Sequence, residues 1–158
     1  MQGERAFDVH WEGPCTLNDL GKYDDDEDAA LYAIYSAHPL YGRRVLVYIG
    51  MTEKGVVSRL KQHDWWTSVE AEPISVHVAY IGEFSGWKDA DAAEAYPRPE
   101  NEIVKAIEAL LIYAHQPAYN QRSKKAALSA AHYRIFNTGL YGALLPEVSG
   151  LYFIQSEC

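Results

Sequence analysis

Two short apolar runs, residues 31–36 and 45–51, flank a segment that contains Pro39 and Gly42. Both runs are rich in Val, Ile and Tyr, the residue types that fit best on a pleated sheet. Proline and glycine between two such runs favour a turn. The pattern therefore predicts two β-strands joined as a hairpin.

A helical pattern follows the second run. Val56, Val57 and Leu60 form an apolar set with helical spacing. Arg59 and His63 lie outside that set and are four residues apart, so a helix places both side chains on one face. The sequence thus predicts a helix that presents an arginine and a histidine directly after the hairpin.

A longer apolar stripe predicts a second helix, which begins near residue 100 and ends before Pro117. Its members recur three or four residues apart: Ile103, Ile107, Leu110, Leu111 and Ala114. Upstream of it, residues 74–81 alternate between apolar and polar positions and predict a third strand. The polar side chains of Ser75 and His77 are expected to face solvent.

These elements predict an α/β (α+β) fold, with a small central sheet of three mainly antiparallel strands flanked by helices in residues 31–122. Residues 1–30 are expected to form an N-terminal arm. It contains a short edge strand at 7–11 and an acidic run at 24–28, which is typical of a solvated loop.

Residues 123–158 are expected to form a C-terminal helix and hairpin appendage packed on the core. The basic, helix-permissive start of this segment is followed by strand-like runs at 133–137 and 151–155. A length of 158 residues suits one domain with such short additions.

The net charge of −8 is distributed unevenly along the chain. Residues 43–63 hold five bases and one acid, giving +4, and residues 121–134 hold four bases and no acid, also giving +4. Phosphate binding requires local positive charge rather than a basic total, so both blocks are candidate nucleic-acid contacts. Chance alternation of basic and acidic surface segments is the alternative.

Five elements in order carry a resemblance to a known family. They are Ala33-Ile34-Tyr35, Tyr48-Ile49-Gly50, Arg59, Glu108 and, shortly after a proline, Asn120. This order and spacing resembles the GIY-YIG nuclease family over about residues 31–122. Ala33 replaces the usual glycine, and the segment between the two signatures is slightly long. The resemblance implies the GIY-YIG fold and a metal-dependent endonuclease, a hydrolase of DNA phosphodiester bonds.

The resemblance also implies roles for single residues. Tyr35 would act as, or orient, the general base for water, and Tyr48 would assist it or bind the phosphate. His63 matches a histidine that some members carry and is the rival general base, because an imidazole titrates near neutral pH whereas a phenol has a pKa of about 10. The choice between Tyr35 and His63 stays open.

The remaining motif residues would bind the phosphate, bind the metal ion and fix the geometry of the site. Arg59 would hold a phosphate oxygen, Glu108 would bind one divalent ion, Mg²⁺ or Mn²⁺, and Asn120 would fix the geometry of the site. The basic side chains expected to contact DNA are Arg43, Arg44, Lys54, Lys61, Arg122, Lys124 and Lys125. Trp65 and Trp66 either pack at the edge of the core or stack on bases.

The remaining expectations concern partners and location. DNA is the expected partner, and a homodimer or a partner chain would supply specificity. The two cysteines are expected to be free thiols in the cytoplasm, and no apolar run is long enough to predict a membrane span. Two other functions remain open: a catalytically inactive nucleic-acid-binding or protein-interaction module of the same fold, and an unrelated α/β domain.

Overall fold

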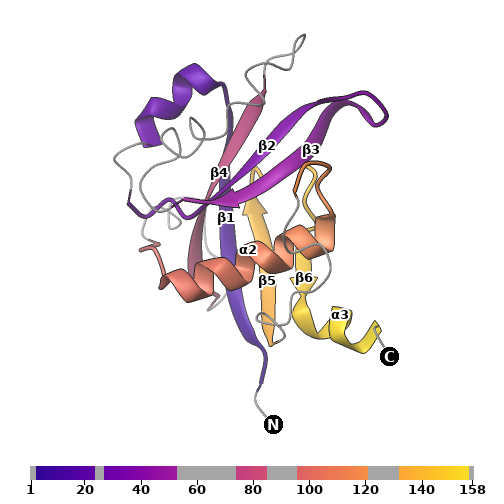
Figure 1. The fold of residues 1–158 in the computed structure, drawn as a ribbon. Helices are drawn as coiled ribbons and strands as arrows, with labels where there is room; N and C mark the ends of the chain where they lie inside the picture. Colours follow the sequence, from indigo (N-terminus) through magenta and orange to yellow (C-terminus); the bar gives the residue numbers. More distant parts are fainter. Residues whose placement is uncertain (1–2, 24–26, 53–73, 85–95, 121–131, 157–158) are drawn as a thin grey trace.

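More residues lie in strands than in helices in the computed structural model, which describes residues 3–23, 27–52, 74–84, 96–120 and 132–156. Within these residues, six strands form one mixed sheet that curls into a half-barrel, in the order β3-β2-β4-β1-β5-β6 (Figure 1). The strands are β1 (Arg5–Cys15), β2 (Leu31–His38), β3 (Gly42–Met51), β4 (Ser75–Glu83), β5 (Tyr133–Gly139) and β6 (Glu147–Ser149). The helices are the 3₁₀ helix η1 (Leu17–Tyr23), α2 (Asn101–His115) and α3 (Gly150–Ser156).

The prediction of an α/β fold with a three-stranded sheet flanked by helices is wrong, because the fold is mainly β. The fold that the resemblance to GIY-YIG nucleases implied is therefore not observed. The difference lies in β1, which was expected in a short arm but pairs antiparallel with β4 and parallel with β5. A sheet of three strands thus continues through β1 into the C-terminal strands β5 and β6.

The polar side chains of β1 explain why it resembled an edge strand. Asp8 is buried, yet its carboxylate accepts hydrogen bonds from the hydroxyls of Tyr96 and Thr138, both at 2.6 Å. Glu12 accepts one from the hydroxyl of Tyr23 at 2.8 Å. Partners from distant parts of the chain thus satisfy side chains that the sequence alone would leave to water.

Other local predictions are confirmed within the described residues. β2 and β3 form the antiparallel hairpin, β4 is the third strand, and α2 is the helix with the apolar stripe. The predicted strand at 151–155 is wrong, because this run lies in α3. A short apolar run does not distinguish a buried strand from a helix. The predicted helix after the hairpin lies outside the described residues.

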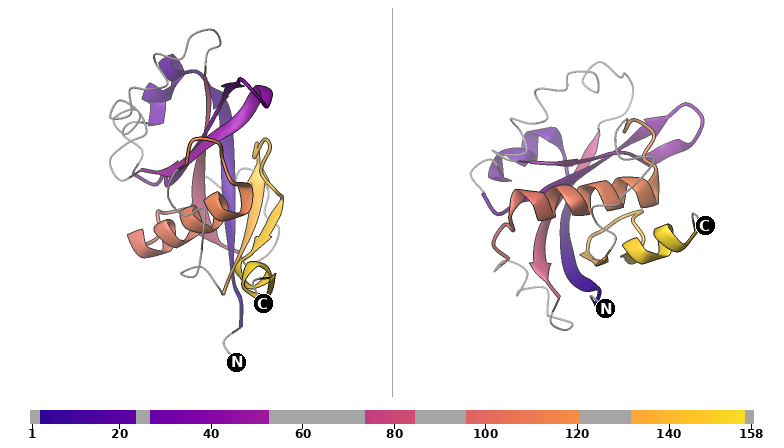
Figure 2. Two further views of the ribbon diagram at one scale, coloured as in Figure 1. Left: turned by 45° about the vertical axis from the view of Figure 1, so that its right-hand side comes forward. Right: turned by 60° about the horizontal axis from the view of Figure 1, so that its bottom comes forward.

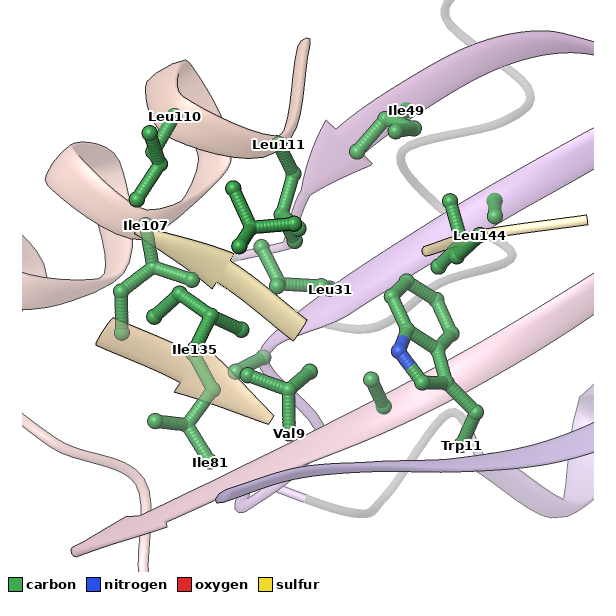
Figure 3. Packing of buried hydrophobic residues seen from close by; sticks show 14 of the residues in the cluster. Val9, Trp11, Leu31, Ile49, Ile81, Ile107, Leu110, Leu111, Ile135 and Leu144 are labelled. Atoms are coloured by element: carbon green, nitrogen blue, oxygen red, sulfur yellow. The ribbon is translucent and has the colours of Figure 1, made fainter. Parts of the chain in front are cut away.

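The apolar core has two parts. In the larger, α2 packs Ile107, Leu110 and Leu111 against the sheet, where they meet residues such as Val9 and Ile49 (Figure 3). The second part lies among other residues of β2, β3 and β4 together with η1, and its fully buried tyrosine is Tyr32. The alternating residues of β2 thus point into two different clusters, a feature that decides which tyrosines lie together.

Two further expectations concern the cysteines and the membrane. Cys15 is a buried, free thiol at the end of β1. None of the helices in the described part of the chain is long and apolar enough to cross a membrane.

Candidate functional site

Tyr48 lies beside Tyr32, a residue for which the sequence predicted no role. The register of β2 on β3 pairs Tyr32 with Gly50 and Ile34 with Tyr48, so these side chains share one face of the sheet. The two tyrosine rings stack at 6.0 Å between centroids and 24° between planes. Tyr32 is fully buried, whereas Tyr48 is partly exposed. The site therefore presents one phenol backed by another.

Gly50 makes room for this arrangement. A Cβ atom on Gly50 would lie only 2.5 Å from the hydroxyl oxygen of Tyr32, closer than real Cβ contacts allow. The glycine thus permits the Tyr32 phenol to approach the backbone of β3 directly. The packing of Tyr32 against β3 therefore explains why the second signature ends in a glycine.

Tyr35 lies on the other side of the sheet. It belongs to the core cluster beneath α2, whereas Tyr48 packs against the second cluster. Its hydroxyl oxygen accepts a hydrogen bond from the backbone N–H of Ala143 at 2.9 Å, and its ring lies 5.0 Å from that of His77. Burial raises the pKa of the Tyr35 phenol. The structure therefore does not bring Tyr35 and Tyr48 together.

An irregularity in β3 is the physical reason. The pairing of Ile34 with Tyr48 is followed by the pairing of Tyr35 with Leu46, so Val47 is an extra residue in β3. Such a bulge resets the alternation of side chains between the two faces. Sequence-based reasoning missed Tyr32 because the bulge leaves no clear mark in the sequence. The one available signal was the triplet Ala30-Leu31-Tyr32, which has the same small–aliphatic–tyrosine order three residues earlier.

Asn120 binds directly to the second signature. Its side-chain oxygen accepts a hydrogen bond from the N–H of Ile49, and its side-chain nitrogen donates to the carbonyl oxygen of Ile49, both at 2.9 Å. The N–H of Tyr119 also donates to the carbonyl of Val47 at 2.8 Å. β3 is an edge strand of the sheet, so these bonds satisfy backbone groups that no neighbouring strand pairs. The segment after α2 is thereby fixed against Tyr48.

Glu108 lies on the middle turn of α2, which ends at His115 and is followed by the C-cap Gln116 and by Pro117. Its side chain is partly exposed. α2 packs on β3 from the side of the sheet that holds Tyr35 and Ile49, whereas Tyr48 packs against the second cluster, so the helix of Glu108 contacts the strand of Tyr48 on the other face. In the described ranges, no group of three or more His, Cys, Asp or Glu residues could hold a metal ion. Mg²⁺ is commonly held by one or two carboxylates and several waters, so a single glutamate is compatible with it.

Two of the predicted DNA contacts are described. Arg43 and Arg44 are exposed at the tip of the β2–β3 hairpin, and Arg44 has a positive φ of 52°. The other predicted site residues lie outside the described residues: Lys54, Arg59, Lys61, His63, Arg122, Lys124 and Lys125. Trp65 and Trp66 also lie outside them.

Two histidines, His77 and the partly exposed His115, hold the loop between β5 and β6. His77 was expected to face solvent, which is wrong: it is buried, and its Nδ1 donates to the carbonyl oxygen of Leu140 at 2.6 Å. His115 donates from Nδ1 to the carbonyl of Leu111 at 2.7 Å and accepts at Nε2 from the N–H of Leu145 at 2.8 Å. Burial lowers the pKa of both imidazoles, so these residues favour the neutral form.

Comparison with protein-family models finds no matching family, and comparisons with curated proteins and with solved structures find no similar protein.

Proposed function

We propose that the protein is a metal-dependent endonuclease that hydrolyses phosphodiester bonds in DNA. The observation that carries the proposal is the contact between Asn120 and Ile49, 71 positions apart in the chain. Two elements of the motif are therefore neighbours in space. The proposal concerns the chemistry of these residues and does not depend on the fold that the resemblance implied.

In this proposal, Glu108 is the protein carboxylate that holds a divalent ion. A divalent ion held by Glu108 would supply Lewis-acid stabilisation of negative charge on the phosphate and on the leaving oxygen. Asn120 holds the backbone of β3 in place, so Tyr48 keeps a fixed position relative to the segment that follows α2. Arg59, by the resemblance, binds a phosphate oxygen through its planar set of donors.

Tyr48 is the phenol that faces the substrate in this proposal, because it is partly exposed, whereas the fully buried ring of Tyr32 stacks behind it and positions it. Tyr35 is a poorer choice for a base, because its hydroxyl is engaged by Ala143 and burial raises its pKa. His63 remains the alternative general base.

A paired substitution tests this assignment. Tyr48→Phe is expected to slow single-turnover DNA cleavage by about 100-fold, the scale of one lost acid–base or electrostatic group. Tyr35→Phe is expected to leave the cleavage rate within about twofold and to cost about 1–3 kcal/mol of stability, because the Ala143 N–H loses its acceptor. The opposite ranking of the two cleavage rates would return the role to Tyr35.

The activity itself is tested with supercoiled plasmid DNA. Purified protein is incubated with plasmid and Mg²⁺ or Mn²⁺, and nicked and linear products are measured on a gel. The proposal expects products with either ion and none in excess EDTA. No cleavage with either ion, by a protein shown to be folded, contradicts the proposal.

A second candidate function is a nucleic-acid-binding module without catalysis. The exposed Arg43 and Arg44 at the hairpin tip favour binding whether or not cleavage occurs. Binding of labelled DNA at low salt without any cleavage would support this candidate over the endonuclease.

A further inference from the structure

The β2–β3 hairpin extends beyond the body of the sheet and carries only positive charge (Figures 1 and 2). Residues 29–52 contain Arg43 and Arg44 and no Asp or Glu, although the whole chain has a net charge of −8. Both arginines are exposed at the tip. This part of the surface is therefore suited to a negatively charged partner.

Two large apolar side chains lie at the same tip. Leu40 is 83% exposed and Tyr41 is 68% exposed. Neither buries much surface in the fold, so neither owes its place to the core. An aromatic ring beside arginines is the side-chain combination that contacts the bases and phosphates of single strands.

Two rings at the tip stack on each other, and a third ring, from the segment after α2, lies tilted beside them. Tyr41 lies on His38 at 4.5 Å between centroids and 23° between planes, and His38 lies 5.7 Å from Tyr119. Nδ1 of His38 faces the backbone N–H groups of Leu40 and Tyr41, at 3.1 and 3.3 Å, and accepts from them. These bonds fix the imidazole, which in turn orients the Tyr41 ring. A base that stacks on the exposed part of Tyr41 would extend an existing stack.

The backbone conformation at Arg44 also indicates a role in binding. Its φ of 52° lies in the left-handed region, which costs free energy for any residue except glycine. Between Ser36 and His38 the pairing with β3 is irregular, so the strand is bulged at Arg43 and Arg44. Glycine would fit this position without strain. A strained position that carries an exposed guanidinium indicates a use for the charge outside the fold.

We propose that the hairpin tip is a stacking platform for an unpaired base, with Tyr41 contacting the base and Arg43 and Arg44 contacting the adjoining phosphates. The inference rests on the proposed endonuclease and narrows its substrate class to DNA that contains an unpaired segment. Stacking on Tyr41 requires an exposed base face, which an intact duplex does not offer. Binding to an unpaired strand is thus favoured over binding to a continuous duplex.

The test measures binding separately from cleavage. Fluorescence anisotropy follows a labelled 20-nucleotide thymidine strand and a blunt duplex of the same length, in EDTA and at low salt. Wild-type protein is expected to bind the single strand more tightly. Tyr41→Ser should weaken that binding by about 5- to 150-fold, the range for one lost stacking contact. Tyr152→Ser is the matched control, because Tyr152 on α3 is equally exposed, at 67%.

A charge variant gives an independent readout. Arg44→Gly relieves the backbone strain, so its melting temperature should be equal or higher, while binding weakens and its salt dependence falls by about 0.7 in the log–log slope. Lys22→Ala on η1, which lies away from the hairpin in Figure 1 and in the right-hand view of Figure 2, should leave the slope unchanged. Tyr41→Trp should retain binding, because another aromatic ring can stack on the base in place of the phenol.

Three results would overturn the inference. They are unchanged single-strand binding by folded Tyr41→Ser, equal losses for Tyr41→Ser and Tyr152→Ser, and binding through Tyr41 to a uridine RNA strand but not to DNA. Plasmid cleavage by wild type together with any of these leaves the endonuclease standing without this platform. Tyr41-dependent binding to the DNA strand without cleavage of any DNA supports the platform and removes the endonuclease.

Discussion

Replacing Asn120 tests how firmly the segment after α2 is fixed to β3. Its side-chain amide accepts one hydrogen bond from the backbone of Ile49 and donates one to it, and Ile49 is fully buried. Asn120→Ala leaves both backbone groups of Ile49 without a partner in a place that excludes water. Each unsatisfied buried group costs about 1–3 kcal/mol, so the total loss of unfolding free energy for the two groups should be about 2–6 kcal/mol.

Asn120→Asp gives a sharper signature, because only one of the two bonds changes. The carboxylate still accepts from the N–H of Ile49, but its other oxygen faces the Ile49 carbonyl, where a donor is required. Protonation restores that donor, so folding raises the pKa of the introduced carboxyl above its ordinary value of about 3.9. A carboxyl whose pKa is raised by folding stabilises the folded protein fully at pH values below its unfolded-state pKa. This stabilisation is lost as the pH rises through the folded-state pKa.

Urea unfolding at pH 7 and pH 4 measures the effect. The deficit of Asn120→Asp relative to wild type should be at least as large as that of Asn120→Ala at pH 7. It should shrink by about 1 kcal/mol or more at pH 4, while the Asn120→Ala deficit stays constant. Asn101→Asp, at an exposed position at the start of α2, is the control and should show no such pH-dependent deficit. A deficit for Asn120→Asp that is the same at both pH values would refute this account of the two bonds.

Two other predictions concern stability. Gly50→Ala should lower the unfolding free energy by about 1–3 kcal/mol, because its Cβ would lie 2.5 Å from the buried Tyr32 hydroxyl. Gly21→Ala is the control, because a Cβ on Gly21 has no atom within 4 Å. An equal melting temperature for the two variants would contradict the close packing at Gly50. Burial depresses the pKa of His115, so its stabilising effect is complete above the unfolded pKa of about 6.5 and is lost as pH falls through the folded pKa. The unfolding free energy should therefore fall between pH 7 and pH 5, and less so in His115→Gln; parallel pH profiles of the two proteins would exclude this role.

The local elements were predictable because each has a strong periodic signal. The hairpin has β-prone runs around Pro39 and Gly42, and α2 has an apolar stripe that ends before Pro117. The central position of β1 was not predictable, since Asp8 and Glu12 alternate with its apolar residues as on a solvated strand. Their partners, Tyr96 and Tyr23 among them, become visible only in the folded chain.

The candidate site was predictable in part. The spacing of Glu108 and Asn120 from the second signature singled out residues on elements that contact β3. The first tyrosine was harder, because Tyr32 and Tyr35 both follow a small and an aliphatic residue. The bulge at Val47 decides which of them shares a face with Tyr48, and it arises from pairing between strands rather than from either strand alone.

Single-turnover cleavage of labelled DNA by wild type and Glu108→Gln, over a range of Mg²⁺ concentrations, tests the proposed chemistry most directly. Glutamine keeps the size of the side chain but removes its charge. We expect wild type to cleave in a Mg²⁺-dependent manner, Glu108→Gln to be slower by about 100-fold or more, and Glu102→Gln, an exposed position on the same helix, to match wild type. Equal rates for Glu108→Gln and wild type would contradict the account.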